Sequence, residues 1–201
     1  AQTLIREADT PIAAPSANLF GYVSPTMAQH VADGLGNRVD LILDGGPCPV
    51  GVESTIVSLA GPQPELLRPG SITIEQLSAV IGAMRLASSV NQPLRAPGQL
   101  PRHYATRTPL IVLPSAEARP LLKDDERAGL LIYSQPRNTD NRFAAVEVLS
   151  STGDLMEAAR HLFAALRRLD ALGLDRIYAE PCQEEGLGVA IMDRLRRCAT
   201  P

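Results

Sequence analysis

Lysine is almost absent from this chain of 201 residues: Lys123 is the only one, and arginine supplies the rest of the 19 basic side chains. A mechanism that needs a lysine from this sequence must therefore use Lys123. Tryptophan is missing, and aromatic residues make up 3% of the chain, which leaves few side chains for stacking on bases. The 22 acidic residues give a net charge of −3, whereas general nucleic-acid-binding and membrane-surface proteins are usually basic.

Long hydrophobic runs are also missing. No apolar stretch approaches the length needed to span a bilayer, and the first residues show no basic and apolar signal pattern. The three cysteines, Cys48, Cys182 and Cys198, lie far apart without CxxC spacing, which favours reduced thiols over disulfides or a metal site. We therefore expect a cytoplasmic protein with no membrane partner and no metal ligands of its own.

The first 85 residues alternate between predicted strands and helices, which is an α/β pattern. The predicted helices cover residues 2–8, 25–36 and 71–83, and the predicted strands cover 11–14, 39–46, 53–59 and 65–68. Ser24 and Pro25 suit the cap and first position of the second helix. Thr73 and Gln76 have the spacing of a capping box at the start of the third.

Residues 86–108 form a predicted linker, since they are rich in proline, serine and glycine and have no sustained hydrophobic period. The stretch from Gln76 to Ala116 contains no acidic residue but four arginines and His103. Two interpretations stay open: a plain solvated tether, or a basic segment that contacts an anion.

Residues 109–201 read as a second α/β unit. Strands are predicted at 108–113, 128–134, 143–150 and 175–180, and helices at 116–123, 153–173 and 188–198. The long helix has leucines and alanines at three- and four-residue spacing with charges on its other faces, which is typical of an amphipathic helix. Strands alternating with helices predict a small, largely parallel sheet flanked by helices.

Polar residues lie on or near the predicted strands of the first unit. "PSAN" and "SPT" supply Ser16, Asn18 and Ser24, "GVESTI" supplies Ser54, and "LRPG" supplies Arg68. Such residues commonly satisfy turns and helix caps, and Arg68 has an ion pair with Glu65 as its ordinary alternative. They also suit a phosphate or carboxylate ligand beside a helix N-terminus. Because the sequence lacks a Walker loop, a complete GxGxxG and a Ser/His/Asp set, we predict binding and charge neutralisation without a catalytic nucleophile.

The string "APSAN…SPT…VDLILDGG…GVESTI…LLRPG" resembles a YrdC-like domain, and "RHY" followed by "TPL" and "EEGLGVAIMDRLRR" resembles the C-terminal part of Sua5 proteins. Together they resemble the two-domain Sua5 type of L-threonylcarbamoyladenylate synthase, over nearly the whole chain. The resemblance implies part of a YrdC-like twisted-sheet domain at 1–85, a linker or lid at 86–108, and a small Rossmann-like domain at 109–201.

The family's reaction would make L-threonylcarbamoyl-AMP from L-threonine, bicarbonate and ATP with Mg²⁺, and it would release pyrophosphate. The L-threonylcarbamoyl-AMP would be used for the t6A modification of tRNA. The resemblance implies that Ser16, Asn18, Ser24, Arg68 and Tyr104 contact ATP and that Ser54 contacts threonine. His103 and Tyr104 would form a lid over the nucleotide, and Tyr104→Ala would weaken nucleotide retention with little loss of stability. A t6A-transfer machinery would act downstream.

The family's lysine- and arginine-rich opening segment has no counterpart here, so we expect the chain to begin part-way through the catalytic domain. Two alternatives to catalysis stay open. One is weak RNA or nucleotide binding, which salt would abolish. The other is a regulatory module built on the C-terminal domain.

Overall fold

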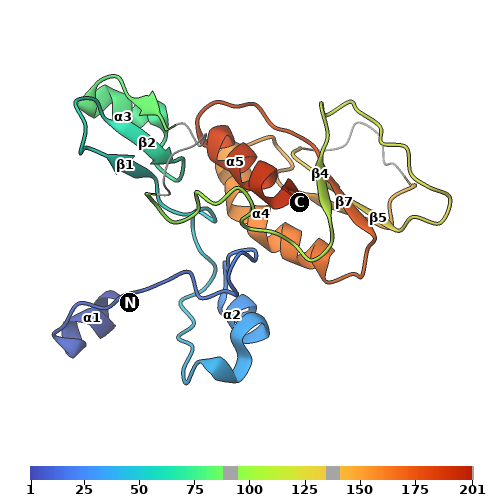
Figure 1. Ribbon diagram of the computed structural model, residues 1–201. Helices are drawn as coiled ribbons and strands as arrows, with labels where there is room; N and C mark the ends of the chain where they lie inside the picture. The colour runs from blue at the N-terminus through green and yellow to red at the C-terminus, as the bar shows by residue number, and fades with distance from the viewer. Residues whose placement is uncertain (88–94, 135–140, 201) are drawn as a thin grey trace.

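The computed structural model describes residues 1–87, 95–134 and 141–200 and contains two separate β-sheets (Figure 1). The three-stranded sheet comes from the first part of the chain and the four-stranded sheet from the second. The predicted α/β class is therefore confirmed in both parts.

The smaller sheet has the order β1-β2-β3, from Ile56–Ser58, Glu65–Arg68 and Arg85–Leu86. β1 and β2 are antiparallel, and β2 and β3 are parallel. Helix α3 (Ile74–Ile81) connects β2 to β3 and begins with the predicted capping box. In it the Thr73 side chain accepts from the Gln76 backbone N–H, and the Gln76 side chain accepts from the Thr73 N–H.

The residues before β1 form little regular structure. They contain α1 (Gln2–Ala8), α2 (Ala28–Leu35) and the 3₁₀ turn η1 (Gly36–Arg38), and none of the three buries a residue. Figure 1 shows α1 and α2 apart from both sheets. The strands predicted at 11–14 and 39–46 are wrong, because a strand needs a partner for its backbone hydrogen bonds and no described segment pairs with either. Leu41 and Leu43 are accordingly 75% and 64% exposed.

The predicted cap at Ser24 is also wrong. Met27 is the N-cap of α2 and makes no side-chain bond. The Ser24 hydroxyl instead donates to the Glu53 carboxylate over 2.8 Å, and the Ser24 carbonyl accepts from Arg167 of the C-terminal unit. These long-range bonds hold Ser24 and Pro25 outside the helix.

The larger sheet has the order β4-β7-β5-β6, and all of its pairings are parallel. Its strands are Leu110–Val112 (β4), Ala128–Ile132 (β5), Ala145–Val148 (β6) and Arg176–Ala179 (β7). Helices α4 (Leu155–Asp170) and α5 (Leu187–Ala199) pack against it, as predicted. The short helix predicted at 116–123 does not form. Pro120 lies in its middle, where it lacks an N–H donor and its ring clashes with the preceding turn.

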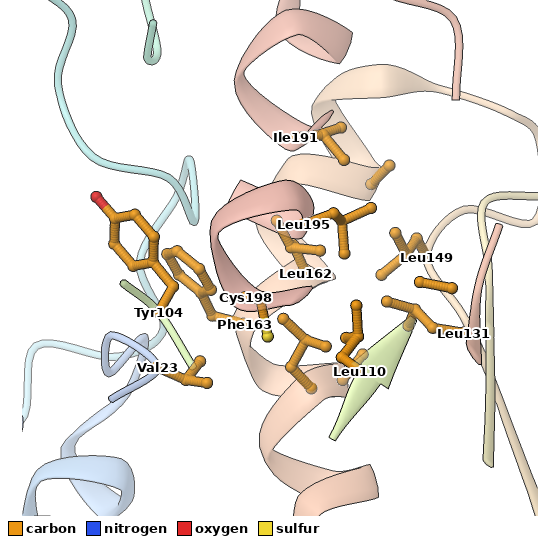
Figure 2. Packing of buried hydrophobic residues seen from close by; sticks show 14 of the residues in the cluster. Val23, Tyr104, Leu110, Leu131, Leu149, Leu162, Phe163, Ile191, Leu195 and Cys198 are labelled. Carbon is orange, nitrogen blue, oxygen red and sulfur yellow. The ribbon is translucent and has the colours of Figure 1, made fainter. Parts of the chain in front are cut away.

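The main hydrophobic core lies between α4, α5 and one face of the larger sheet (Figure 2). The amphipathic stripe of α4 is buried, including Leu162, Phe163 and Leu166. Three residues from outside the C-terminal unit, Val23, Val52 and Tyr104, belong to the same cluster. The core therefore also anchors the N-terminal part of the chain.

The predicted linker starts slightly later than expected, because Leu86 belongs to β3. Its segment 95–108 is packed against both units. Ala105 N–H donates to the Gly21 carbonyl over 2.8 Å, and the Gln99 amide donates to the Leu67 carbonyl over 3.1 Å. On the other side, the Arg197 guanidinium donates to the Leu100 carbonyl over 2.7 Å. These contacts contradict a plain solvated tether for 95–108; the rest of the segment, 88–94, lies outside the described residues.

Candidate functional site

Arg68 ends β2 and is buried beneath the linker. Its Nε and Nη2 atoms donate to the Ser54 carbonyl at 3.2 and 2.9 Å, and Nη1 donates to the Pro97 carbonyl at 3.2 Å. Nη2 also lies 3.3 Å from the Ser54 hydroxyl. The alternative ion pair with Glu65 does not form, because residues three apart on a strand point to opposite faces. Arg68 and Ser54 therefore lie side by side.

Glu65 has two other arginine partners on its own face. Arg85 of β3 lies 3.2 Å and Arg95 of the linker 2.5 Å from its carboxylate. Arg95 is one of the basic residues in the acid-free stretch. Its ion pair with Glu65 therefore attaches the linker to β2.

Tyr104 lies in the core with 1% of its surface exposed. Its ring stacks on Phe163 at a centroid distance of 5.4 Å, and the Arg194 guanidinium lies 5.1 Å from the ring centre. Figure 2 shows the ring beside Phe163 and the hydroxyl pointing away from the core cluster. The expectation that Tyr104 is a removable lid residue is therefore wrong as regards stability.

The Tyr104 hydroxyl and Arg68 converge on Gly98. A Cβ atom at Gly98 would lie 2.5 Å from the Tyr104 Oη and 3.1 Å from the Arg68 Cδ. Gly98 also has a positive φ of 83°, which favours glycine. The linker can approach both side chains only because this residue has no side chain.

His103 packs edge-on against Tyr104, with ring centroids 4.1 Å apart. Burial lowers the pKa of His103, and the positive charges of Arg197 and Arg194 lower it further. Burial raises the pKa of Tyr104. At neutral pH the pair therefore offers a neutral imidazole and a neutral phenol, which can bind a ligand's polar groups without adding charge.

Four buried side-chain polar atoms lack a hydrogen-bond partner within the part of the chain that the structure describes: Asn18 Oδ1, His103 Nδ1, Tyr104 Oη and Arg194 Nη2. Arg194 Nη2 lies 3.0 Å from Glu53 Oε2, close enough for an ion pair but without hydrogen-bond geometry. The other three belong to residues predicted to contact ATP or form the lid. Buried polar atoms are normally satisfied by protein or by ordered water, so these three atoms are candidates for contact with water or a ligand.

The loop containing Ser16 and Asn18 adjoins this cluster. The Asn18 amide donates to the carbonyls of Leu19 and Tyr22 at 2.8 and 3.0 Å, as the turn interpretation expects. Ser16 is exposed. Tyr22 forms a bridge to Ala105 and donates to Asp170 over 2.7 Å, which fixes the loop against the linker and α4.

Glu53 and Arg194 are central to the site but were missed as site residues. The Glu53 carboxylate accepts from the Ser24 hydroxyl through Oε1 and from the Arg194 Nε through Oε2, at 2.8 and 3.0 Å. The sequence did contain a signal. Arg194 shares the apolar face of α5 with Leu187, Ile191 and Cys198, where a charge must be paired.

Two family models match almost the whole chain. Residues 1–70 match the Sua5/YciO/YrdC model, described as "Telomere recombination", and residues 72–200 match "Threonylcarbamoyl-AMP synthase, C-terminal domain". The chain belongs to the Sua5 family. The second match includes "DRLRR", the segment of α5 that carries Arg194.

Sua5 relatives align along nearly all of this chain. Threonylcarbamoyl-AMP synthases from Pyrococcus abyssi and Bacillus subtilis are 38% and 40% identical to it, over 98% and 99% of its residues. The chain spans 60% of the length of each.

The P. abyssi Sua5 crystal structure in complex with L-threonine matches with a TM-score of 0.83 at 35% identity, over 98% of this chain and 60% of that one. A second P. abyssi structure, in which a histidine and the following tyrosine are replaced by alanine, gives 0.82 at 34% identity, over 98% of this chain and 59% of that one. The two-part Sua5 architecture is therefore confirmed.

No group of three or more potential metal ligands gathers among the residues that the structure describes. Within those same residues, no helix combines the length and apolarity needed to cross a membrane. The Glu53 carboxylate, which accepts from the Ser24 hydroxyl, already has Arg194 as its partner. Mg²⁺ therefore has no set of three carboxylate, histidine or cysteine ligands among these residues.

Proposed function

We propose that this Sua5 chain takes part in the synthesis of L-threonylcarbamoyl-AMP from L-threonine, bicarbonate and ATP, with release of pyrophosphate. The observation that carries the proposal is the alignment of nearly the whole chain with curated threonylcarbamoyl-AMP synthases. The product would serve the t6A modification of tRNA through a separate transfer machinery. Three free cysteines favour a reducing compartment, which supports the cytosol as its location.

The chemistry matches the polar groups of the site. The threonine amine and bicarbonate give a carbamate and a molecule of water. A carbamate oxygen then attacks the α-phosphorus of ATP, and the bond to the departing pyrophosphate breaks. This step requires aligned reactants and neutralised phosphate charge, and no protein nucleophile is needed. Magnesium would enter with ATP as the nucleotide complex.

We assign the ATP side of the site to Arg68, with Ser16, Asn18 and Ser24 along the neighbouring loop. A buried guanidinium can grip a phosphate with two parallel hydrogen bonds. Ser54, beside Arg68, would contact threonine. The crystal structure of the P. abyssi relative with L-threonine supports a threonine site in this fold.

His103 and Tyr104 would cover the nucleotide from the linker. The pair is the one His–Tyr dipeptide in the sequence, and a histidine and a following tyrosine are the residues replaced in the P. abyssi variant. Their unsatisfied polar atoms would meet the ligand. Because Arg68 donates to the Pro97 carbonyl, a phosphate that takes over this bond would displace the linker locally.

The first experiment is calorimetric titration with ATP–Mg²⁺ and L-threonine, on this chain and on a form that spans the full length of the relatives. In the longer form we expect both ligands to bind and pyrophosphate to be released only when threonine, bicarbonate and ATP are all present. Pyrophosphate release without threonine would contradict the proposal. Salt-sensitive binding of RNA without that release would favour the nucleic-acid alternative.

The Arg68→Met variant tests the assigned phosphate contact. We expect ATP affinity to fall at least about tenfold, as for loss of a charge-assisted pair of hydrogen bonds. Arg85→Met is the matched control, since Arg85 is largely exposed and pairs with Glu65 on the opposite face of β2. Equal ATP affinities for the two variants, both folded by circular dichroism, would remove Arg68 from the nucleotide site.

A further inference from the structure

Arg194 is a fully buried arginine that joins α5 to the N-terminal unit. Its side chain is 0% exposed. It lies 3.0 Å from the Glu53 carboxylate, donates to the Pro69 carbonyl over 2.9 Å, and sits over the Tyr104 ring. A buried charge is tolerated only with such pairing. One side chain of the C-terminal domain thus contacts the "GVESTI", "LRPG" and "RHY" segments together.

The contacts of Arg194 fall next to the proposed substrate-binding residues. Glu53 precedes Ser54, and Pro69 follows Arg68. These two strand ends are themselves tightly packed: a Cβ atom at Gly70 would lie 2.3 Å from the Glu53 carbonyl oxygen. The contacts of Arg194 with Glu53 and Pro69 therefore also restrain the backbone from which the Ser54 and Arg68 side chains project.

Glu53 also connects Arg194 to the loop that contains Ser24. Its two oxygens are divided between Ser24, on Oε1, and Arg194, on Oε2. Removal of the arginine would leave a partly buried carboxylate with Ser24 as its remaining side-chain partner in the described chain. Such a carboxylate would turn toward water, and the Ser24 contact would weaken with it.

The neighbouring residues of α5 hold Arg194 and the linker together. Asp193 accepts from Arg194 Nη1 over 2.7 Å and from Arg197 Nε over 2.9 Å. Arg197 in turn donates to the Leu100 carbonyl, and its own carbonyl accepts from His103 N–H over 3.4 Å. The "DRLRR" segment is therefore one connected network beneath the linker.

We propose that Arg194 is a positioning residue of the threonine and ATP site, supplied by the C-terminal domain. It sets the strand ends that present Ser54 and Arg68 and, through Glu53, the loop that presents Ser24. This inference rests on the proposed function for its ligands. It gives the C-terminal domain a stated role: completion of a site whose substrate contacts come from the N-terminal unit and the linker.

The test compares Arg194→Met and Arg194→Lys with Arg196→Met, in the form of the protein that spans the relatives' length. Arg196 is two residues away on the same helix, and it is 56% exposed and paired with Glu184. Two quantities are measured on each folded variant: the dissociation constants for L-threonine and ATP–Mg²⁺, and amide hydrogen exchange at residues 22–25 and 52–55. Exchange reports on the positioning without any ligand.

We expect Arg194→Met to weaken both ligands at least about tenfold and to speed exchange in the two segments, while Arg196→Met changes neither. Arg194→Lys should restore part of the affinity for both ligands, because lysine keeps the positive charge but lacks the several planar N–H donors of the guanidinium. In the Glu53→Gln background Arg194→Met should have a smaller effect on affinity, because the part of its effect that passes through the Glu53 contact is already weakened. Unchanged exchange and affinity in a folded Arg194→Met protein would overturn the inference. If the unmutated protein binds neither ligand, the proposed function fails, and the exchange result alone decides whether Arg194 positions these segments.

Discussion

At the scale of single residues, Tyr104 combines two environments in one side chain. Its ring is a core residue that stacks on Phe163, whereas its hydroxyl lacks a partner beside Gly98 and Arg68. The backbone there is unusual too, since Tyr104 has a φ of 59°. Non-glycine residues in this region are concentrated at sites where the surrounding structure imposes it. We therefore assign the ring to stability, and under the proposed function we expect the hydroxyl to contact the ligand.

Two substitutions separate these contributions. Tyr104→Ala should lower the free energy of unfolding by about 3–5 kcal/mol, the range for a buried aromatic side chain, because it leaves a cavity beside Phe163. Tyr104→Phe keeps the ring and should leave stability within about 0.5 kcal/mol but weaken ATP binding. Urea denaturation and calorimetry measure the two effects. A Tyr104→Ala protein as stable as the parent would show that the ring is not part of the core in solution.

At the scale of elements, the close approach of two strand ends at Gly70 holds the site together. A Cβ atom there would meet the Glu53 carbonyl oxygen and the Ser54 and Thr55 backbone at 2.3–2.5 Å. Distances this short involve backbone on both sides, so the segments must move apart to admit a side chain. The position of the C-terminal end of β2 is therefore coupled to the position of the segment before β1.

Gly70→Ala should reduce the free energy of unfolding by about 1–3 kcal/mol through this overpacking, and it should weaken threonine binding because Ser54 moves. Gly34→Ala on α2 is the matched control: a Cβ there meets nothing within 4 Å. Helix propensity should make that change neutral or stabilising by about 1 kcal/mol. Thermal and urea unfolding of the two variants would detect the difference in sign. Equal stabilities would disprove the close approach.

The elements differ in how far the sequence predicts them. β2, α3 and the C-terminal strands and main helices follow from local pattern, because their caps and apolar faces are present in the chain. The segments 11–14 and 39–46 have the pattern of strands but no partner among the described residues. Pairing is a long-range property, so composition alone could not reveal its absence. Arg194 escaped prediction for the same reason, since its partner Glu53 is 141 positions away.

At the scale of the whole molecule, two partly buried histidines link stability to pH. Burial and Arg167 lower the pKa of His30, and burial, Arg197 and Arg194 lower that of His103. A histidine with a lower pKa in the folded state binds fewer protons there than in the unfolded chain. Unfolding therefore takes up protons below the unfolded value of about 6.5, and stability falls as the pH drops from about 6.5 toward the folded pKa values.

We expect the urea midpoint to be constant between about pH 7 and 8 and to fall between about pH 6.5 and 5. His30→Gln with His103→Gln should flatten this fall, because neither replacement can take up a proton. Depressed carboxyl pKa values, such as that of Glu184 beside Arg196, act at lower pH and leave this window unaffected. A double variant with the same midpoint curve as the parent would exclude the two histidines as its cause.

The buried Arg194–Glu53 pair also constrains how the sequence can change over time. Loss of either charge alone leaves its partner unpaired, so single replacements at the two positions should be selected against in a functional protein. Exchange for a neutral pair of similar volume avoids that penalty. Substitutions at positions 53 and 194 should therefore occur together across Sua5 sequences, and a lineage that loses the C-terminal domain should also lose the glutamate.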